Sequence, residues 1–90
     1  MRGVHVVISG RVQGVGFRVW VEAEAVSRGL AGWVRNRRDG SVEAVFSGED
    51  DAVGAMLKAC WEGLDMAVVT DVAISDTDER PSGFELRATI

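Results

Sequence analysis

Residues 10–18 have the composition of a loop that could bind an anion. They read Gly-Arg-Val-Gln-Gly-Val-Gly-Phe-Arg, and the glycines can adopt backbone conformations closed to other residues, which lets neighbouring N–H groups converge. Arg18 adds a guanidinium fork suited to bidentate contact with phosphate. The segment lacks the Gly-Lys-Ser/Thr sequence of a P-loop and the third glycine of a dinucleotide-binding loop, so it gives little support to nucleotide binding. From these residues alone, a tight turn with a solvated Arg18 explains the segment as well as an anion site does.

A strand and a helix are predicted on either side of this loop. Apolar side chains alternate through residues 4–9, which is the period of a strand with one packed face. The run from Arg18 to Arg28 contains no Gly or Pro, and Gly29 follows in the position typical of a helix C-terminus. The start of this helix would place free N–H groups and a partial positive charge beside Arg18, so phosphate is the natural ligand.

The rest of the chain continues with further strands and a second helix. Residues 30–38 and 41–47 are rich in β-forming residues and are separated by Asp39-Gly40, which favours the tight turn of a hairpin. Residues 68–75 predict another strand, and after the polar loop 76–83 a final short strand is expected to carry Phe84 and Leu86 on one face. Between these pairs of strands, apolar residues recur at helical spacing after side chains that could cap or charge-stabilise a helix start. The apolar residues are Val53, Met56, Leu57 and Cys60, and the helix-start residues are Ser47, Glu49 and Asp50.

The predicted order of elements is strand, helix, strand, strand, helix, strand and a short terminal strand. This order is typical of the α+β, ferredoxin-like split βαβ fold, an antiparallel sheet with two helices on one face. The length fits a single domain, which we expect to span residues 1–90. In this topology the first two strands run parallel with another between them, so the loop after the first and the end of the second share an edge. We therefore expect residues 10–18 and Asn36 to be neighbours.

Composition and charge narrow the class of protein. Hydrophobic residues make up 47% of the chain, with three Trp and three Phe, which favours a folded core. The net charge of -4 disfavours broad binding to nucleic acid or anionic lipid, and no apolar run approaches the roughly 20 residues of a membrane span. Cys60 is the only cysteine, so neither an intramolecular disulfide nor a cysteine-rich zinc site is implied. We expect a cytoplasmic monomer that binds neither membrane nor nucleic acid.

Two segments together resemble the signatures of the acylphosphatase family. They are residues 10–18 and Gly-Trp-Val-Arg-Asn at 32–36, the second followed by Asp-Gly-Ser-Val-Glu at 39–43. The resemblance covers nearly the whole chain, since the length, the element order and Gly63 at the end of the second helix also fit. It implies a ferredoxin-like fold and an enzyme that hydrolyses small acyl phosphates to carboxylate and inorganic phosphate without a metal or cofactor.

The resemblance also implies roles for individual residues. Arg18 and Asn36 would be catalytic, with Asn36 orienting the attacking water. Acyl phosphates already carry a good leaving carboxylate, so positioning and charge stabilisation can suffice without a strong base or a covalent nucleophile. The phosphate would be bound by Gln13, Gly14, Val15, Gly16, Phe17 and Arg18.

Other side chains that could do chemistry have simpler explanations. His5 could be a base, but it lies within a strand and outside the glycine loop, where a structural role is more common. Cys60 belongs to an apolar helical stripe, which favours a core residue over a redox thiol. The acidic residues near the second helix and in the loop 76–83 are explained by capping and solvation, so no metal is assigned. Roles stay open for the basic run Arg35, Arg37 and Arg38 and for the tryptophans Trp20, Trp33 and Trp61.

Two other classes of protein share this architecture. A ferredoxin-like module could bind an anionic ligand without turnover, although Arg18 and Asn36 together favour the enzyme. A nucleic-acid module would require aromatic residues on the open sheet face and a basic patch. The first strand offers His5, Val7 and Ser9 to that face and the chain is acidic, so this class has the least support.

Overall fold

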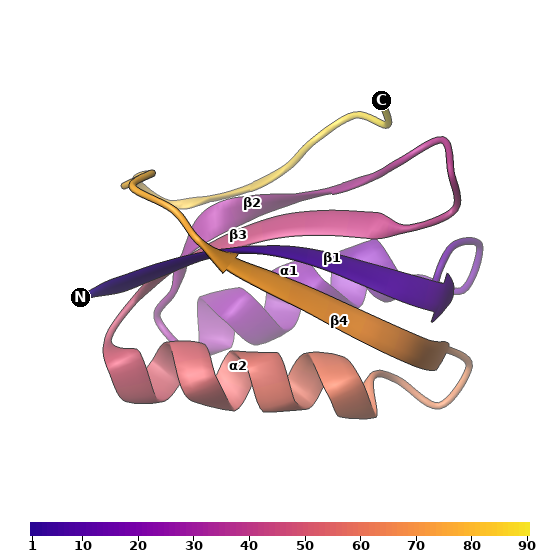
Figure 1. Ribbon diagram of the computed structural model, residues 1–90, viewed down its shortest axis with the longest axis horizontal. Coiled ribbons are helices and arrows are strands. Elements are labelled where there is room, and N and C mark those ends of the chain that lie inside the picture. Colours follow the sequence, from indigo (N-terminus) through magenta and orange to yellow (C-terminus); the bar gives the residue numbers. More distant parts are fainter.

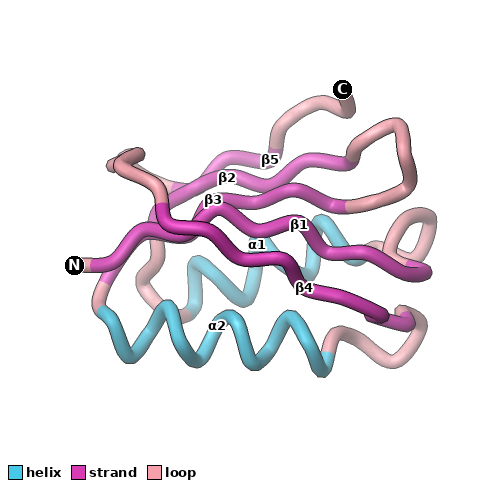
Figure 2. The backbone as a smooth tube through the Cα atoms, viewed as in Figure 1, coloured by secondary structure: helices cyan, strands magenta, loops and turns pink.

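The computed structural model describes residues 1–90, which fold into a five-stranded sheet. Two helices lie against this sheet (Figure 1). The backbone trace in Figure 2 places both helices on the same side of the sheet. The elements follow the predicted order. They are β1 (Arg2–Arg11), α1 (Phe17–Ser27), β2 (Ala31–Asn36), β3 (Val42–Gly48), α2 (Asp50–Glu62), β4 (Val68–Asp76) and β5 (Phe84–Leu86).

The strand order in the sheet is β4-β1-β3-β2-β5, which confirms the ferredoxin-like fold. β3 pairs antiparallel with β1 and β2, so these two strands run parallel with β3 between them, and β4 pairs antiparallel with β1. The predicted antiparallel sheet is wrong for β5, which pairs parallel with β2 through Gly32 and Phe84. After β4 the chain crosses the sheet where β1 begins, with the Thr77 N–H donating to the Gly3 carbonyl. Because β2 starts at that same end, β5 enters beside it in the same direction.

Alternation along the strands builds the core between the sheet and the helices. Val4, Val6 and Ile8 of β1 are fully buried, whereas His5 on the opposite face is partly exposed. Burial raises the pKa of the Cys60 thiol to about 12, and this cysteine is a core residue as predicted. The helices contribute Phe17, Val21 and Ala25 from α1 and Val53, Met56, Leu57 and Cys60 from α2.

The start of α2 differs from the prediction. Ser47 belongs to β3, and Glu49 precedes the helix without a side-chain hydrogen bond to it, so the predicted capping by these side chains is wrong. Asp50 and Asp51 occupy the first turn, where negative charge stabilises a helix by about 0.3–1 kcal/mol. The beginning of α2 is therefore stabilised by charge and not by a capping hydrogen bond.

Trp61, near the other end of α2, is half exposed.

α1 begins at Phe17, one residue before the predicted start, and Gly29 follows its end with a φ of 72°. Trp20 packs partly buried against the core, with its ring centroid 5.3 Å from that of Phe17. Arg28 forms a 3.0 Å ion pair with Glu24 one turn earlier.

Neither α1 nor α2 combines the length and apolar character that crossing a membrane would require.

Candidate active site

The loop between β1 and α1 has a backbone that favours glycine at two positions. φ is 75° at Gly14 and 79° at Gly16, whereas Val15 between them does not share the positive φ. No atom lies within 4 Å of the place a Cβ would occupy at either glycine, so the conformation and not the space requires glycine. Such alternation can turn successive N–H groups toward one point. None of the N–H groups from Gln13 to Val19 donates a hydrogen bond within the chain, which leaves them free for a ligand.

The N-terminus of α1 follows this loop and carries a partial positive charge that no acidic side chain of its first turn offsets. Phe17, the first helical residue, is 1% exposed and anchors the helix start in the core. The Trp20 N–H donates the first bond of the helix to the Gly16 carbonyl at 3.0 Å. No acidic residue lies in the first turn, in contrast to Asp50 and Asp51 in α2. The positive end of α1 is therefore left for an external anion, whereas that of α2 is met by its own side chains.

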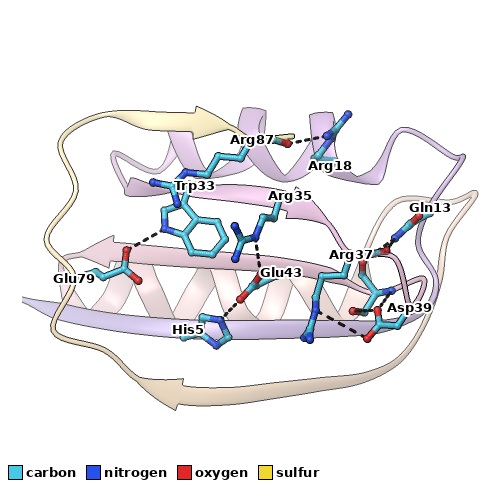
Figure 3. Close-up of polar contacts among 11 residues, drawn as sticks. His5, Gln13, Arg18, Trp33, Arg35, Arg37, Asp39, Glu43, Glu79 and Arg87 are labelled. Atoms are coloured by element: carbon cyan, nitrogen blue, oxygen red, sulfur yellow. Dashed lines mark hydrogen bonds and ion pairs between the residues drawn. The ribbon is translucent and has the colours of Figure 1, made fainter. Parts of the chain in front are cut away.

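Arg18 is held by a backbone carbonyl and by no acidic side chain. Its Nη1 donates a 2.9 Å hydrogen bond to the carbonyl oxygen of Arg87, just after β5 (Figure 3). Arg18 takes part in none of the ion pairs of the structure. A guanidinium has several N–H donors, so this single bond leaves the other donors and the charge for a ligand. Arg87 was not predicted from the sequence, because a contact through a backbone carbonyl has no side-chain signature.

Asn36, the last residue of β2, carries an acceptor without a partner. Its Oδ1 is buried and makes no hydrogen bond within the chain. Leaving a buried polar atom unpaired costs about 1–3 kcal/mol, a cost that is removed where water or a ligand completes the bond. The Asn36 backbone is fixed, since its carbonyl accepts a 3.2 Å hydrogen bond from the Ile90 N–H. Asn36 can therefore offer a hydrogen bond from a well-held position.

A cavity of about 260 Å³ brings these groups together. Most of residues 12–18 line it together with Asn36, so the glycine loop and Asn36 are neighbours, as predicted. Among the predicted site residues only Val15 is absent from its lining, because this side chain packs against the core. The other hollow of the structure lies between α1 and α2 and contains neither Arg18 nor Asn36. The lining residues are Val12, Gln13, Gly14, Gly16, Phe17, Arg18, Val19 and Asn36, of which Val12 and Val19 were not predicted.

The side chain of Gln13 ties the glycine loop to the turn between β2 and β3. Its Nε2 donates to the carbonyl oxygens of Arg37 at 2.7 Å and Ser41 at 2.8 Å (Figure 3). The Asp39 carboxylate accepts hydrogen bonds from the Ser41 hydroxyl at 2.6 Å and the Ser41 N–H at 2.9 Å, which lower the pKa of Asp39. Arg37 approaches Asp39 to 4.0 Å, and Arg38 is exposed. The side-chain amide of Gln13 thus holds the loop, and the backbone N–H of Gln13 remains to donate to a ligand.

His5 lies on the helix-free face of the sheet, away from the cavity. Its Nε2 is 2.6 Å from Glu43 Oε2, and the Arg35 Nε donates to Glu43 Oε1 at 2.7 Å. Burial raises the pKa of Glu43, but the hydrogen bonds from Arg35 and His5 outweigh it and lower this pKa overall. His5 thus has the structural role expected from the sequence, and Arg35 is paired. No group of three or more His, Cys, Asp or Glu side chains is arranged to hold a metal ion.

Fold and site together define a class of protein. A glycine loop with free N–H groups, a helix N-terminus without acidic residues and an arginine meet in one cavity at the edge of a ferredoxin-like sheet. Arg18 is the only ionisable side chain that lines this cavity, which therefore favours an anion. The class is that of small α+β proteins with a site suited to a phosphoryl group.

Comparisons with known proteins identify the family. The Acylphosphatase family model matches residues 4–86. An acylphosphatase of Azorhizobium caulinodans is 53% identical over 89 residues, which cover 97% of this chain and 96% of the relative. The crystal structure of acylphosphatase from Bacillus subtilis matches with a TM-score of 0.92 at 37% identity, over 97% of this chain and 99% of that one. An acylphosphatase structure from Coxiella burnetii gives a TM-score of 0.91 at 39% identity, over 96% and 92% of the two chains.

The chain therefore belongs to the acylphosphatase family and is a hydrolase that acts on acyl phosphates. A binding module without turnover is not favoured by these matches.

Proposed function

We propose that Arg18 and the backbone N–H groups of residues 13–17 hold the phosphoryl group of the acyl phosphate, and that Asn36 orients the attacking water. The observation that carries this proposal is the absence of internal partners: the loop N–H groups and Asn36 Oδ1 are unpaired, and all of these residues except Val15 line one cavity with Arg18. Val15 and Phe17 would contribute their N–H groups alone, because both side chains pack in or against the core.

The donors suit the charge that develops during phosphoryl transfer. The equatorial oxygens of the phosphoryl group carry negative charge in the transition state, and the loop N–H groups, the start of α1 and Arg18 are all positive. These donors are already oriented by backbone conformation and by the Arg87 carbonyl, so little reorganisation accompanies the reaction. Loss of one such donor typically lowers the rate by about 10²–10³.

Water is the nucleophile in this scheme. It attacks phosphorus, the bond from phosphorus to the acyl oxygen breaks, and the carboxylate leaves with the electron pair. No carboxylate, imidazole, thiol or hydroxyl side chain lines the cavity, so the chain offers neither a base nor a covalent nucleophile there. Asn36 Oδ1 can accept a hydrogen bond from the water and fix its direction of attack. The proton that the water loses passes to a phosphate oxygen or to solvent.

We further propose that residues 1–90 act as a single, monomeric domain in the cytoplasm without a cofactor or nucleic-acid partner. One sheet and one hydrophobic cluster that contains both helices support the single domain. A lone, buried cysteine fits a reducing compartment. The net charge of -4 is unfavourable for a phosphate backbone.

The test is the hydrolysis of benzoyl phosphate by the purified protein with excess chelator. Wild type is compared with Arg18→Ala, Asn36→Ala and Asn36→Asp, the last of which keeps the side-chain shape but places a negative charge beside the phosphoryl group. Arg2→Ala is the matched control, because Arg2 lies at the far end of β1 and makes no side-chain hydrogen bond or ion pair. Circular dichroism establishes that each variant folds.

We expect turnover by wild type and Arg2→Ala, and losses of about 10²-fold or more in the Arg18 and Asn36 variants. Wild-type turnover that survives in folded Arg18→Ala or Asn36→Ala would refute the role of that residue. Phosphate binding by folded wild type without any hydrolysis would instead support a non-catalytic module.

A further inference from the structure

The helix-free face of the sheet carries a connected group of side chains that the proposed mechanism does not use. Trp33 lies at its centre and is only 4% exposed. Its Nε1–H donates to Glu79 Oε1 at 3.1 Å, and His5 meets its ring edge-on (Figure 3). The guanidinium carbons of Arg35 and Arg87 lie 4.7 Å and 4.5 Å from the ring centroid. Trp33 is therefore covered by charged groups and is not an open platform for a ligand.

Arg87 connects this face to the cavity. Its side chain stacks on Trp33, while its backbone carbonyl accepts the hydrogen bond from Arg18 Nη1. Its N–H donates to the Val34 carbonyl at 2.8 Å, which extends the pairing beside β2. The guanidinium also approaches Glu85 to 3.5 Å. The backbone and the side chain of Arg87 are thus both held by contacts that do not involve Arg18.

We propose that Trp33 and Arg87 are positioning residues for Arg18. The indole fixes the Arg87 side chain, the Arg87 backbone follows, and its carbonyl holds the Arg18 guanidinium at the cavity. The inference rests on the proposed role of Arg18 in binding the phosphoryl group. Trp33 does not line the cavity and makes no hydrogen bond with Arg18, and Arg87 links the two by stacking on the indole and accepting from Arg18.

The physical reason lies in the flexibility of arginine. An unrestrained arginine side chain has many rotamers, and ordering it when substrate binds weakens binding and misplaces the positive charge. A hydrogen bond from a charged guanidinium to a carbonyl is stronger than a neutral one, so the Arg87 carbonyl is an effective restraint only if it is itself held in place. The contact of Arg87 with the buried indole contributes to that hold, together with the hydrogen bond from the Arg87 N–H to the Val34 carbonyl.

The experiment compares Arg87→Ala and Trp33→Leu with the conservative variants Arg87→Lys and Trp33→Phe, which keep the cation and the aromatic face. Matched controls are Arg2→Ala and Trp61→Leu, since Trp61 is half exposed on α2 and does not line the cavity. Measured quantities are kcat and KM for benzoyl phosphate and the inhibition constant of inorganic phosphate. We expect Arg87→Ala and Trp33→Leu to lower kcat/KM by about fivefold to thirtyfold, and the conservative variants to stay within about threefold of wild type.

A double variant separates positioning from general stability. In an Arg18→Ala background, Arg87→Ala should change kcat/KM by less than about twofold, because the group that it positions is gone. Full multiplication of the two losses would show that Arg87 acts independently of Arg18 and would overturn the inference. Arg87→Ala should also fold more readily than Trp33→Leu, because the Arg87 side chain is 38% exposed and Trp33 is buried.

The two proposals fail in different ways. If Arg18→Ala alone keeps wild-type kcat/KM, the role of Arg18 is wrong and the positioning inference falls with it. If Arg18→Ala loses turnover while folded Arg87→Ala keeps it, only the positioning inference is wrong.

Discussion

The Gln13 side chain gives a quantitative test of how the glycine loop is held. Its amide donates to the carbonyls of Arg37 and Ser41 at 2.7 Å and 2.8 Å. Both carbonyls keep a partner when the amide is removed, because the Arg37 oxygen also accepts from the Gly40 N–H and the Ser41 oxygen from the Arg37 N–H. Gln13→Leu therefore removes two hydrogen bonds and leaves no carbonyl unpaired.

The expected loss follows from the value of such bonds. Each contributes about 0.5–1.5 kcal/mol, so Gln13→Leu should lower the free energy of unfolding by about 1–3 kcal/mol. For a chain of this length each kcal/mol lowers the melting temperature by about 4–8 °C. The released loop must be ordered again when an anion binds, so the affinity for inorganic phosphate should fall as well.

Thermal and urea denaturation followed by circular dichroism measures the stability, and a phosphate titration measures the affinity. Ser27→Ala is the control, because it removes a 2.9 Å bond to the Glu24 carbonyl at an exposed site and should change stability by less than about 0.5 kcal/mol. A Gln13→Leu protein with the stability and the phosphate affinity of wild type would refute the reasoning.

Three further predictions concern other elements. Gly16→Ala should lower the free energy of unfolding by about 1–2 kcal/mol, because the φ of 79° at Gly16 strains any other residue. Gly54 lies inside α2 with open space beside it, so Gly54→Ala should raise the free energy of unfolding by about 0.5–1 kcal/mol. Urea denaturation of both variants checks the contrast. Because folding lowers the pKa of Glu43, its contribution to stability is present above the ordinary value of 4.5 and is lost as the pH falls below it, so the stability of Glu43→Gln should vary less with acid than that of wild type. Cys60, with a thiol pKa of about 12, should resist a thiol reagent at neutral pH until urea unfolds the chain; rapid labelling of the native protein would contradict its burial.

Much of the cavity was predictable because side-chain types and strand topology determine it. Gly14 and Gly16 lie between β1 and α1, outside both elements, and Arg18 in the first turn of α1 completes the pattern from which an anion site was predicted. The parallel arrangement of β1 and β2 then brings Asn36 to the same end of the sheet. Each of these steps depends on periodicity or residue type, which a sequence displays directly.

The parts that escaped prediction depend on the backbone or on three-dimensional contacts. β5 has only three residues, so its parallel pairing with β2 is decided by the path of the preceding loop. Arg18 and Gln13 both donate to backbone carbonyls, at Arg87 and at Arg37 and Ser41. Almost any residue could offer such a carbonyl, so residue types at these positions do not reveal the contacts. Trp33 faces the helix-free side by strand alternation, and its burial depends on His5, the two arginines and Glu79 around it, which no sequence pattern displays.

The central claim is that the β1–α1 loop and Arg18 hold the phosphoryl group, and a titration of ¹⁵N-labelled protein with inorganic phosphate tests it most directly. We predict that the largest shifts in amide resonances occur at residues 13–19 and that Arg18→Ala weakens the binding. The start of α2 is the internal control, because Asp50 and Asp51 should repel phosphate from that helix N-terminus. Phosphate binding that leaves residues 13–19 unshifted and moves resonances elsewhere would contradict the claim.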